Sequence, residues 1–447
     1  MKGAVTRRDF LKSVAAGAAA APWVGSRLRA AETATVRHAS IGANGMALGD
    51  ITSFAKHPSF QLVAVADVDL ARVERVKQQF PQARIYQDWR ELLTKERRNL
   101  HSVNVSTPDH MHAAIAMAAM RMGLHVYVQK PLAATIREVR KLTEYARAHR
   151  LVSQMGIQIS SAPSQRAYEA MVRAGTIGKI KEVHTFCDKS WGAEGRLPEG
   201  SSPVPPALDW NEWVGIAEMR PYQEGLYHPG EWRRRVGFGT GTLGDMGCHI
   251  VSPPFRALGL SAPISIASHG PAPTQDNWAV RARVHYVFRG SPLTAADTLD
   301  LWWYDGDERP PAHVLALAGE HMPKSGSVTI GTDGALVLPH IADPILLPTD
   351  KFSTVERPTV EPRDHYFEFL EKVAEARTTR GGSPPQASAS FSYSGPLTET
   401  VLLGNVAAWY GGETLEWDAR RISIAGRPAA KAHLERKYRK GWPRKGL

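Results

Sequence analysis

Residues 36–47 read Val36-Arg-His-Ala-Ser-Ile-Gly-Ala-Asn-Gly-Met-Ala47, an apolar run followed by a glycine-rich turn. A strand, a glycine turn and the start of a helix are typical of a parallel sheet with crossover helices. The turn follows the G-x-G-x-x-G/A spacing, although an asparagine replaces the second glycine. Such a turn lets the backbone approach a pyrophosphate closely at a helix N-terminus. The stretch therefore predicts a dinucleotide site that includes Gly42, Asn44, Gly45 and Met46.

The next apolar run, Leu62–Ala66, ends at Asp67. An acidic residue at the end of the second strand can accept hydrogen bonds from both hydroxyls of the adenosine ribose, and it repels a 2′-phosphate. Asp67 therefore favours NAD as the cofactor, while NADP stays open because Asp69 and Arg72 lie close in sequence. The alternative interpretation is that Asp67 only caps a turn.

Two further strand ends carry polar residues. Residues 102–105 lead into Ser-Thr-Pro-Asp-His at 106–110, and residues 125–128 lead into Gln-Lys-Pro at 129–131. Ligands of an open parallel sheet bind outside the carboxyl ends of its strands, so both segments should face a nicotinamide ring. A lysine there can donate a hydrogen bond to a substrate hydroxyl, or it is simply exposed; the histidines at 110 and 112 also fit a structural role. The pattern assigns Thr107, Pro108, His110 and Gln129 to the cofactor and Lys130 to catalysis.

The run Thr240-Gly-Thr-Leu-Gly-Asp-Met-Gly-Cys-His249 places a carboxylate and an imidazole four residues apart. If the run forms a helix, Asp245 and His249 share one face, about one turn apart. An imidazole titrates near neutral pH and a carboxylate can fix its tautomer, so such a pair can move a proton. The alternative is a pair of surface or packing residues. We expect both residues to be catalytic, with Asp245 orienting His249.

The sequence changes character from about residue 155. Several strand-like runs follow without long helices between them, which favours an antiparallel open sheet with one free face. We expect these strands at 181–188, 280–288, 298–304, 327–330 and 335–338, and helices at 164–175, 363–378 and 396–410. The predicted fold class is α/β, with an N-terminal Rossmann domain at 32–155 and a C-terminal α+β domain at 156–447, for substrate binding and oligomerisation, whose open sheet is largely antiparallel.

Residues 197–231 are rich in proline, glycine and aromatic side chains. Aromatic faces offer flat apolar surfaces on which a sugar ring can stack, so this segment can form the wall of a carbohydrate site. The alternative is a surface loop packed on its own aromatic residues. We expect the residues here that are nearest in sequence to Asp245 to bind substrate, namely Tyr227, His228, Trp232 and Arg233.

The N-terminal residues carry a targeting pattern. Thr6-Arg-Arg-Asp-Phe-Leu-Lys12 precedes a weakly apolar, alanine-rich run, and small residues follow at Ala30 and Ala31. Consecutive arginines before such a run resemble a twin-arginine export signal. The run is too short and too mild for a permanent membrane span, and an ordinary amphipathic helix is the alternative. We expect residues 1–31 to be a signal peptide read by the twin-arginine export machinery, and the mature protein to be periplasmic.

The net charge of +11 is concentrated at the two ends of the chain. Residues 1–30 carry +5 and residues 431–447 carry +6, so the body between them is close to neutral. A neutral body argues against a nucleic-acid-binding face. The two cysteines, Cys187 and Cys248, lack the spacing of a metal site. We expect two unpaired structural cysteines and no metal, although a disulfide stays open in an oxidising compartment.

Together these motifs resemble the glucose–fructose oxidoreductase and inositol dehydrogenase (Gfo/Idh/MocA) superfamily over nearly all of residues 35–442. The resemblance rests on the glycine turn, Asp67 and the Ser-Thr-Pro-Asp-His, Gln-Lys-Pro and Gly-Asp-Met-Gly-Cys-His segments. It implies an oxidoreductase that acts on sugars, polyols and their derivatives, with catalysis by Lys130, Asp245 and His249. It also implies that the free sheet face makes a subunit contact, hence a homo-oligomer.

Three positions depart from the pattern of that superfamily. Gln129 stands where a glutamate is usual, Asn44 stands in the glycine turn, and Ser252 stands where a final aspartate is expected. The consecutive prolines at 253 and 254 should kink or restart the helix after the catalytic turn.

The leading interpretation is a periplasmic enzyme that oxidises a secondary alcohol of a sugar, cyclitol or glycoside. His249 would remove the hydroxyl proton and Lys130 would stabilise the developing alkoxide. Because a periplasmic enzyme has no free nicotinamide pool, the cofactor is expected to stay bound. The first alternative is a redox-neutral glycosidase or lyase that uses bound NAD and passes through a ketone. The second is a carbohydrate-binding protein without catalysis.

Overall fold

The glycine turn at residues 42–47 joins the first strand and the first helix of a parallel sheet. In the computed structural model, which describes residues 35–379 and 384–442, this sheet has the strand order β3-β2-β1-β4-β5-β6. Each adjacent pair is parallel. The winding reverses between β1 and β4, and dinucleotides bind at such a switch point. The strands are β1 (Val36–Ile41), β2 (Phe60–Ala66), β3 (Arg84–Tyr86), β4 (Ser102–Val105), β5 (His125–Gln129) and β6 (Ser153–Gly156).

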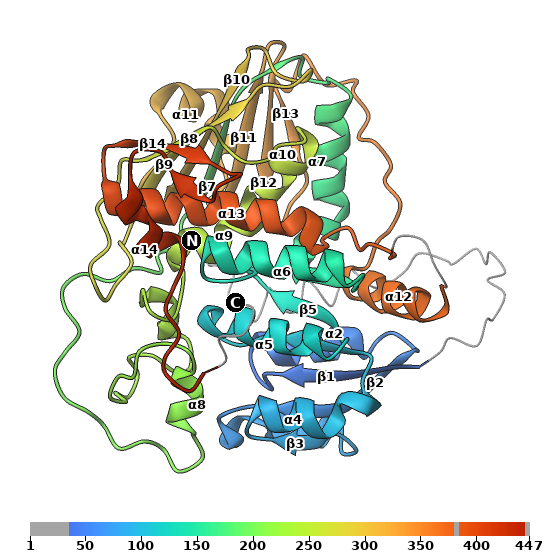
Figure 1. Cartoon of the computed structure of the whole chain (residues 1–447). Helices are drawn as coiled ribbons and strands as arrows, with labels where there is room; N and C mark the ends of the chain where they lie inside the picture. Colours follow the sequence, from blue (N-terminus) through green and yellow to red (C-terminus); the bar gives the residue numbers. More distant parts are fainter. Residues whose placement is uncertain (1–34, 380–383, 443–447) are drawn as a thin grey trace, which may run out of the picture. The chain divides into compact units, whose positions relative to one another are not determined.

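Helices cross over between these parallel strands and cover the sheet (Figure 1). The last of them begins with a capping box, in which Thr135 and Glu138 each accept a hydrogen bond from the other's backbone N–H. This reciprocal pair satisfies two N–H groups that the helix end would otherwise leave without partners. The crossover helices are α2 (Met46–Phe54), α3 (Glu74–Gln79), α4 (Trp89–Glu96), α5 (Asp109–Arg121) and α6 (Ile136–Ala148). The predicted signal peptide at 1–31 lies outside the described residues.

A helix from late in the chain, α12 (His365–Thr378), also covers the first sheet. Its Phe369 and Val373 are fully buried against Val36 and Phe54. The apolar layer over this side of the sheet is therefore completed by residues that come late in the chain, at 365–378.

The second sheet is mixed and mostly antiparallel, in the order β13-β12-β11-β7-β10-β9-β8-β14-β15. Only β7 and β10 pair in parallel among its described strands. A parallel sheet followed by this one confirms the predicted α/β fold class with its largely antiparallel second sheet. The strands are β7 (Ile180–Cys187), β8 (Ser265–Ser268), β9 (Ala282–Arg289), β10 (Thr298–Asp305), β11 (Gly326–Gly331), β12 (Ala335–Pro339), β13 (Ile345–Leu347), β14 (Thr414–Asp418) and β15 (Ser423–Ile424).

Strand β9 shows how the second sheet separates its two faces. Val284, Tyr286 and Phe288 are buried in the core, as the alternating sequence predicts. His285, between them, lies on the opposite face, where its Nε2 is 2.7 Å from Asp300. At β9, one face of the sheet therefore packs into the core, while the opposite face carries polar side chains.

The helix α13 (Phe391–Ala407) lies beside α6 and is buried on almost every side (Figure 1). A helix that is apolar all round needs packing partners all round. Arg140 of α6 forms a bidentate ion pair with Glu399 of α13. The helix begins at Phe391, earlier than the predicted start at 396, because the buried Phe391 extends the helix across Pro396.

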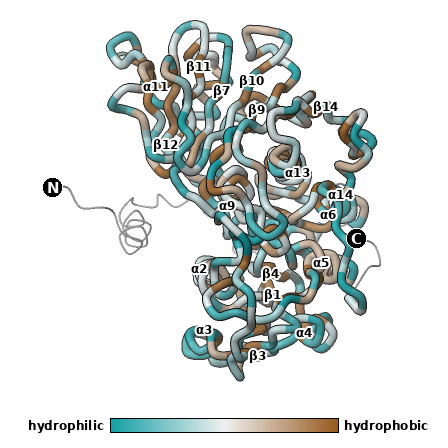
Figure 2. Tube along the Cα trace, turned by 90° about the vertical axis from the view of Figure 1, so that its left-hand side faces the viewer, coloured by the Kyte–Doolittle hydropathy of each residue, from teal (hydrophilic) through white to brown (hydrophobic). Residues whose placement is uncertain are grey.

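The predicted catalytic turn forms the helix α9 (Gly241–Ile250), and Figure 2 shows α9 between the strands of the two sheets. The next helix restarts at Ser252 with both prolines in its first turn, as predicted. Both cysteines are buried and unpaired, as expected. Among the described residues, no helix combines the length and hydropathy that a membrane crossing requires. The remaining helices are α7 (Pro163–Arg173), α8 (Trp210–Val214), α10 (Ser252–Ala257), α11 (Ala312–Ala318) and α14 (Lys431–Leu434).

Candidate active site

Lys130 and Asp245 meet at the carboxyl edge of the first sheet. Lys130 directly follows β5, and Asp245 lies in the second turn of α9. The Lys130 Nζ donates to Oδ1 of the Asp245 carboxylate and, over 2.7 Å, to the backbone carbonyl of the same residue. The two side chains are only 13% and 12% exposed. Two residues from opposite halves of the chain thus form one largely buried ion pair.

The glycines at the start of α9 permit this close approach. Gly241 has a φ of +67°, and a Cβ there would lie 3.0 Å from the Trp278 ring. At Gly244 a Cβ would lie 2.0 Å from the Thr240 hydroxyl oxygen. That hydroxyl instead donates to the buried carboxylate of Asp109, over 2.6 Å, at the start of α5. The glycines therefore let α9 pack directly against the first sheet, with Asp245 beside Lys130.

Hydrogen-bond donors and positive charges surround the Asp245 carboxylate. Trp191 donates its indole N–H to Oδ2 over 2.9 Å, and Nε of Arg233 lies 3.5 Å from Oδ1. Burial alone would raise the pKa of Asp245, but the charges of Lys130 and Arg233 outweigh burial and hold this pKa below its ordinary value. Asp245 is therefore a carboxylate at neutral pH.

His249 lies one turn further along α9, with its ring 5.7 Å from that of His340. Its Nδ1 is enclosed and has no hydrogen-bond partner among the described residues. Burial, and then the charge of Lys130, lower the pKa of His249 well below its ordinary value, so the ring is neutral at neutral pH. The expected contact, in which an imidazole N–H of His249 would donate to the Asp245 carboxylate, is not formed between these two side chains. The reason is that a charged ammonium competes better than a neutral ring for the carboxylate.

The sequence did not point to three neighbours of this group. Lys189 and Trp191 follow the end of β7, and His340 follows the end of β12. The Lys189 Nζ contacts Met246 Sδ over 3.3 Å, and its charge helps to lower the pKa of Asp245. Burial, followed by Lys189 and Lys130, lowers the pKa of His340 to about 4. The signal available for all three is the one that marks Lys130, a polar or aromatic residue just after the end of a strand.

The glycine turn has the shape that a pyrophosphate needs. Gly42 has a φ of +110°, and a Cβ there would lie 2.6 Å from the Ser106 carbonyl oxygen. Gly45 has a φ of +59° and open space where a Cβ would stand. In the fully described helix α2, no acidic residue occupies the first turn and no side chain caps it, and Met46 at its start is 46% exposed. The N-terminus of α2 can therefore hold a diphosphate.

Asn44 avoids the space in front of α2 by folding back on its own turn. Its side-chain oxygen accepts the Gly45 N–H over 2.7 Å, and its amide donates to the Arg72 carbonyl over 3.2 Å. The departure at position 44 therefore leaves the approach to the helix open.

Asp67 ends β2 with its carboxylate turned towards the glycine turn. The two oxygens accept backbone N–H groups from Ala43 over 2.9 Å and from Asp69 over 3.0 Å. Burial raises the pKa of Asp67, although both hydrogen bonds oppose the rise. Each oxygen keeps a further lone pair, so ribose hydroxyls can still donate to it. The residue thus fits both earlier interpretations, since it stabilises the turn and is placed for a ribose.

Thr107 and Pro108 form the loop between β4 and α5. The ring of His112 ties this loop to the one after β5, with nitrogens 2.9 Å from the Thr107 carbonyl and 2.8 Å from the Pro131 carbonyl. The two predicted strand ends are therefore held side by side. His112 provides this link and is not itself directed at a ligand.

His110 is not brought to Lys130. Its Nε2 lies 3.1 Å from the Trp213 carbonyl, and its ring packs edge-on to Phe238. Burial lowers the pKa of His110 to about 3. Its place in an aromatic cluster agrees with the structural alternative.

Gln129 belongs to a buried network behind Lys130. Its amide donates to both oxygens of Asp50 over 3.0 Å. Asp50, in α2, also accepts from Ser106 over 2.7 Å and from Tyr366 over 2.9 Å. Burial raises the pKa of Asp50 to about 6, although these hydrogen bonds oppose the rise. Gln129 therefore joins β5 to α2, β4 and α12 without a contact to the Lys130 ammonium.

The aromatic segment packs largely on itself, as its alternative interpretation holds. Tyr227 and Trp232 are buried together with Trp210, Trp213 and Phe238. Of the four predicted substrate residues, Arg233 alone is brought near Asp245. Its guanidinium also lies over the Trp232 ring, 4.3 Å from the centroid.

His228 instead links the aromatic segment to the end of β2. Trp213 donates its indole N–H to Nδ1 over 3.2 Å, and Nε2 lies 2.9 Å from Asp69. Because an indole N–H can only donate, Nδ1 is the acceptor and Nε2 donates to the carboxylate. His228 therefore lies on the adenosine side of the dinucleotide site.

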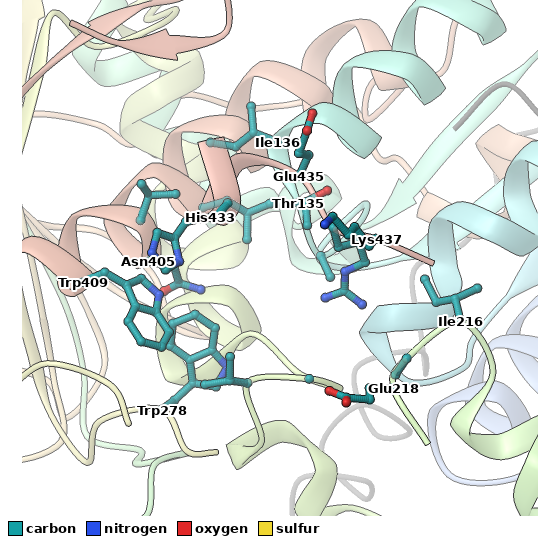
Figure 3. Close-up of a pocket in the computed structure, with 18 residues that line it drawn as sticks. Thr135, Ile136, Ile216, Glu218, Trp278, Asn405, Trp409, His433, Glu435 and Lys437 are labelled. Carbon is teal, nitrogen blue, oxygen red and sulfur yellow. The ribbon is translucent and has the colours of Figure 1, made fainter. Parts of the chain in front are cut away.

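A separate cavity of about 250 Å³ adjoins α13 and α14. Figure 3 shows Trp278 and Trp409 on one of its sides and Lys437 on another. Lys130, Asp245 and His249 do not line it. The cavity is connected to the start of α9 through Asn405, whose amide donates to the Thr240 carbonyl over 2.8 Å.

Two family models match the chain. One, described as "Oxidoreductase family, NAD-binding Rossmann fold", matches residues 36–157. The other, described as "Oxidoreductase family, C-terminal alpha/beta domain", matches residues 176–293. Together they span more than half of the chain, including the glycine turn, Lys130 and α9.

The curated proteins that are similar to this chain include a dehydrogenase and a glycosyl hydrolase. Levoglucosan dehydrogenase from Pseudarthrobacter phenanthrenivorans is 25% identical over 164 residues, which cover 37% of this chain and 34% of that protein. Glycosyl hydrolase family 109 protein 1 from a Shewanella species is 28% identical over 190 residues, which cover 40% of this chain and 41% of that protein. The match thus spans about a third to two fifths of these relatives.

Among solved structures, GenD2 from gentamicin A biosynthesis, determined in complex with NAD, is similar with a TM-score of 0.58. The two are 17% identical, and the match covers 86% of this chain and 97% of that one. At this identity the likeness shows a shared fold.

Proposed function

This chain belongs to the Gfo/Idh/MocA family of NAD-binding oxidoreductases, and from that premise we propose that it transfers a hydride between bound NAD and a secondary alcohol of a sugar, cyclitol or glycoside. The observation that carries the proposal is the buried Lys130–Asp245 pair, close to neutral His249, at the carboxyl edge of the dinucleotide-binding sheet. The partial match to levoglucosan dehydrogenase supports a carbohydrate substrate.

Lys130 is suited to stabilise charge on the substrate oxygen. An ammonium has three N–H donors, and Asp245 accepts two of them at its carboxylate and its carbonyl. The third donor stays available for the oxygen that becomes negative as its proton leaves. Asp245 is therefore a positioning residue, which holds Lys130 in place through a carboxylate that Trp191 and Arg233 secure.

His249 is suited to move the hydroxyl proton. A neutral imidazole can accept it, and the burial that depresses the pKa of His249 makes the resulting imidazolium a ready donor in the reverse direction. The bound dinucleotide supplies the hydride acceptor at its nicotinamide ring. Lys130 and His249 would act on the same substrate oxygen.

The proposal includes a dinucleotide that stays bound through turnover. Residues 205–228 lie against the end of β2, where the adenosine ribose would bind. There the Leu70 N–H donates to the Ala207 carbonyl over 3.0 Å, and His228 donates to Asp69. A retained dinucleotide suits a protein that is exported in the folded state, because the periplasm has no nicotinamide pool. The twin arginines of the sequence support this location. A homo-oligomer formed through the free face of the second sheet belongs to the same proposal.

A second candidate function is a redox-neutral glycosidase or lyase that passes through a ketone. The match to glycosyl hydrolase family 109 protein 1 supports it. Such a reaction also needs a base for the proton on the carbon beside the ketone, and His340 is a second neutral imidazole close to His249. A binding protein without catalysis is less favoured, because a buried ion pair and an unpartnered imidazole cost stability without a functional return.

The test uses protein purified with its bound dinucleotide. Free sugars, cyclitols and glycosides are added in turn, while absorbance at about 340 nm reports cofactor reduction. The proposal predicts a stoichiometric rise with one class of alcohol and its loss in Lys130→Met. No rise with any alcohol, in protein shown to hold oxidised NAD, would refute hydride transfer.

The glycosidase alternative is tested with glycosides in deuterated water. It predicts deuterium on the ring carbon beside the oxidised one, and this exchange should disappear in His340→Gln while cofactor reduction persists. Turnover without exchange would exclude this alternative and leave the simple dehydrogenase.

A further inference from the structure

Three potential metal ligands converge on the polar face of the second sheet, outside the site described above. Glu182 and His184 lie two residues apart on β7, so their side chains share one face. His313 lies in the first turn of α11. One ligand atom from each residue lies within 4.8 Å of the other two. The carboxylate stands between the rings, with Oε1 3.0 Å from His313 Nε2 and Oε2 3.1 Å from His184 Nε2.

His184 has the features of a prepared ligand. It is 1% exposed, and its Nδ1 lies 3.1 Å from the Tyr304 hydroxyl. Its Nε2 is enclosed and, apart from the Glu182 carboxylate 3.1 Å away, has no polar partner in the described part of the chain. The contact of Nδ1 with Tyr304 is typical of metal-bound histidines, whose second nitrogen commonly forms a hydrogen bond that fixes the tautomer and the ring orientation.

The spacing fits one small cation after a modest adjustment. Ligand atoms about 2.1 Å from a tetrahedral ion lie about 3.4 Å from one another. Each ring nitrogen already lies close to that distance from one oxygen of the Glu182 carboxylate, Oε2 for His184 and Oε1 for His313, so the adjustment must bring both nitrogens to one ion. The remaining adjustment falls on His313, which is 59% exposed. Two imidazoles and one carboxylate form a ligand set that zinc accepts readily.

We propose that Glu182, His184 and His313 bind one zinc ion, with water in the remaining position. The ion would join the start of α11 to β7. It would thereby hold α11 over the apolar cluster in which Val314 packs with Phe186. The sequence offered no signal for this site, because Glu182 and His313 are 131 positions apart.

The test is a zinc titration of the full mature chain, with any affinity tag removed, against a chromogenic zinc chelator. We expect one zinc per chain and a weakening of about 100-fold or more in His313→Gln, given that even outer partners of zinc ligands contribute 10–100-fold. Because His313 is exposed, this variant should keep its fold. Cobalt should give visible absorption of tetrahedral intensity in the wild type and lose it in the variant.

A matched control lies on the same face of the same sheet. His285 pairs with Asp300 over 2.7 Å, with no third ligand grouped with them in the described residues. His285→Gln should therefore leave zinc affinity unchanged. The proposal is overturned if the wild type binds no zinc against the chelator, or if His313→Gln and His285→Gln bind it as tightly as the wild type.

Discussion

At the scale of single residues, the carboxylate of Asp245 accepts a hydrogen bond from Lys130 and none from His249 on its own helix. Asp245→Asn should therefore lower kcat by weakening the hold on Lys130, and by less than Lys130→Met does. The double variant Asp245→Asn with Lys130→Met should be no slower than Lys130→Met alone, because Asp245 acts through Lys130. His249→Ala should lower kcat by about 10²–10⁴, and its effect should multiply with that of Asp245→Asn.

The effects of the single and double variants are compared through their single-turnover rates of cofactor reduction. If Asp245→Asn were instead non-additive with His249→Ala and additive with Lys130→Met, Asp245 would act through the histidine. The amount of bound dinucleotide in each variant serves as the control for folding.

The Gln129–Asp50 contact predicts a pH-dependent loss of stability in Gln129→Glu. A second carboxyl would lie about 3 Å from Asp50, so the folded state would hold a proton more tightly than the unfolded state does. A carboxyl with a raised folded-state pKa lowers stability once the pH exceeds that pKa. The free energy of unfolding should drop by about 2–3 kcal/mol at about pH 7.5 and recover towards about pH 5.

Denaturant unfolding at both pH values measures the effect. The matched rescue is the exchange Asp50→Asn with Gln129→Glu, which restores one amide and one carboxylate at the same contact. A drop that is equal at both pH values, or no rescue by the exchange, would contradict the assignment of this network.

Several site residues could be proposed from the sequence because reactive residue types lie at the ends of predicted strands or at helical spacing. Lys130 and Asp245 follow rules that depend only on local spacing, and the structure brings them together. The partners could not be proposed in the same way. Asp50 contacts Gln129 only because α2 and β5 are neighbours in space, and the competition between Lys130 and His249 for one carboxylate depends on that tertiary geometry.

At the scale of elements, residues 205–228 connect the second half of the chain to the end of β2. His228→Leu removes the hydrogen bond to Asp69. One such bond contributes about 1–1.5 kcal/mol, so the dinucleotide should dissociate about tenfold faster. The rate of hydride transfer should stay the same, since His228 does not touch Lys130 or Asp245.

Arg220→Gln is the matched control, because Arg220 lies in the same segment but pairs with Asp276 over 2.7 Å. Release is followed by the loss of nicotinamide fluorescence after the reduced protein is mixed with excess oxidised NAD. Equal acceleration by both variants would show that His228 has no particular role.

Element positions could be predicted where the pattern was strong and local. The strand predicted at 280–288, for example, forms β9 at Ala282–Arg289. The start of α13 was placed too late, because Pro396 reads as a boundary while the burial of Phe391 extends the helix past it. Short strands such as β13, which has three residues, are defined by their partners and leave no periodic signal of their own.

At the scale of the whole molecule, α12 ties the late part of the chain to the first sheet. The two sheets should therefore unfold in one transition. Phe369→Ala, at a fully buried position, should cost about 3–5 kcal/mol and lower the midpoint of that single transition. Tryptophan fluorescence, which includes Trp302 and Trp303 of the second sheet, and dinucleotide release from the first sheet should change together.

Leu317→Ala, at a position that is 39% exposed, is the control and should change little. Dinucleotide release well before the fluorescence change, in the wild type or in Phe369→Ala, would show instead that the first sheet opens independently.

The position of α12 has a consequence for the order in which the protein is made. A ribosome produces every strand of the first sheet before it reaches residues 365–378. Until then, the apolar surface around Val36, Phe54 and Tyr127 has no cover, and exposed surfaces of this kind are recognised by chaperones and proteases. A chain that stops early, even with its glycine turn and Lys130 complete, keeps that surface exposed. Only a chain that extends through α12 buries this apolar surface, so chaperones and proteases can distinguish an incomplete chain from a complete one.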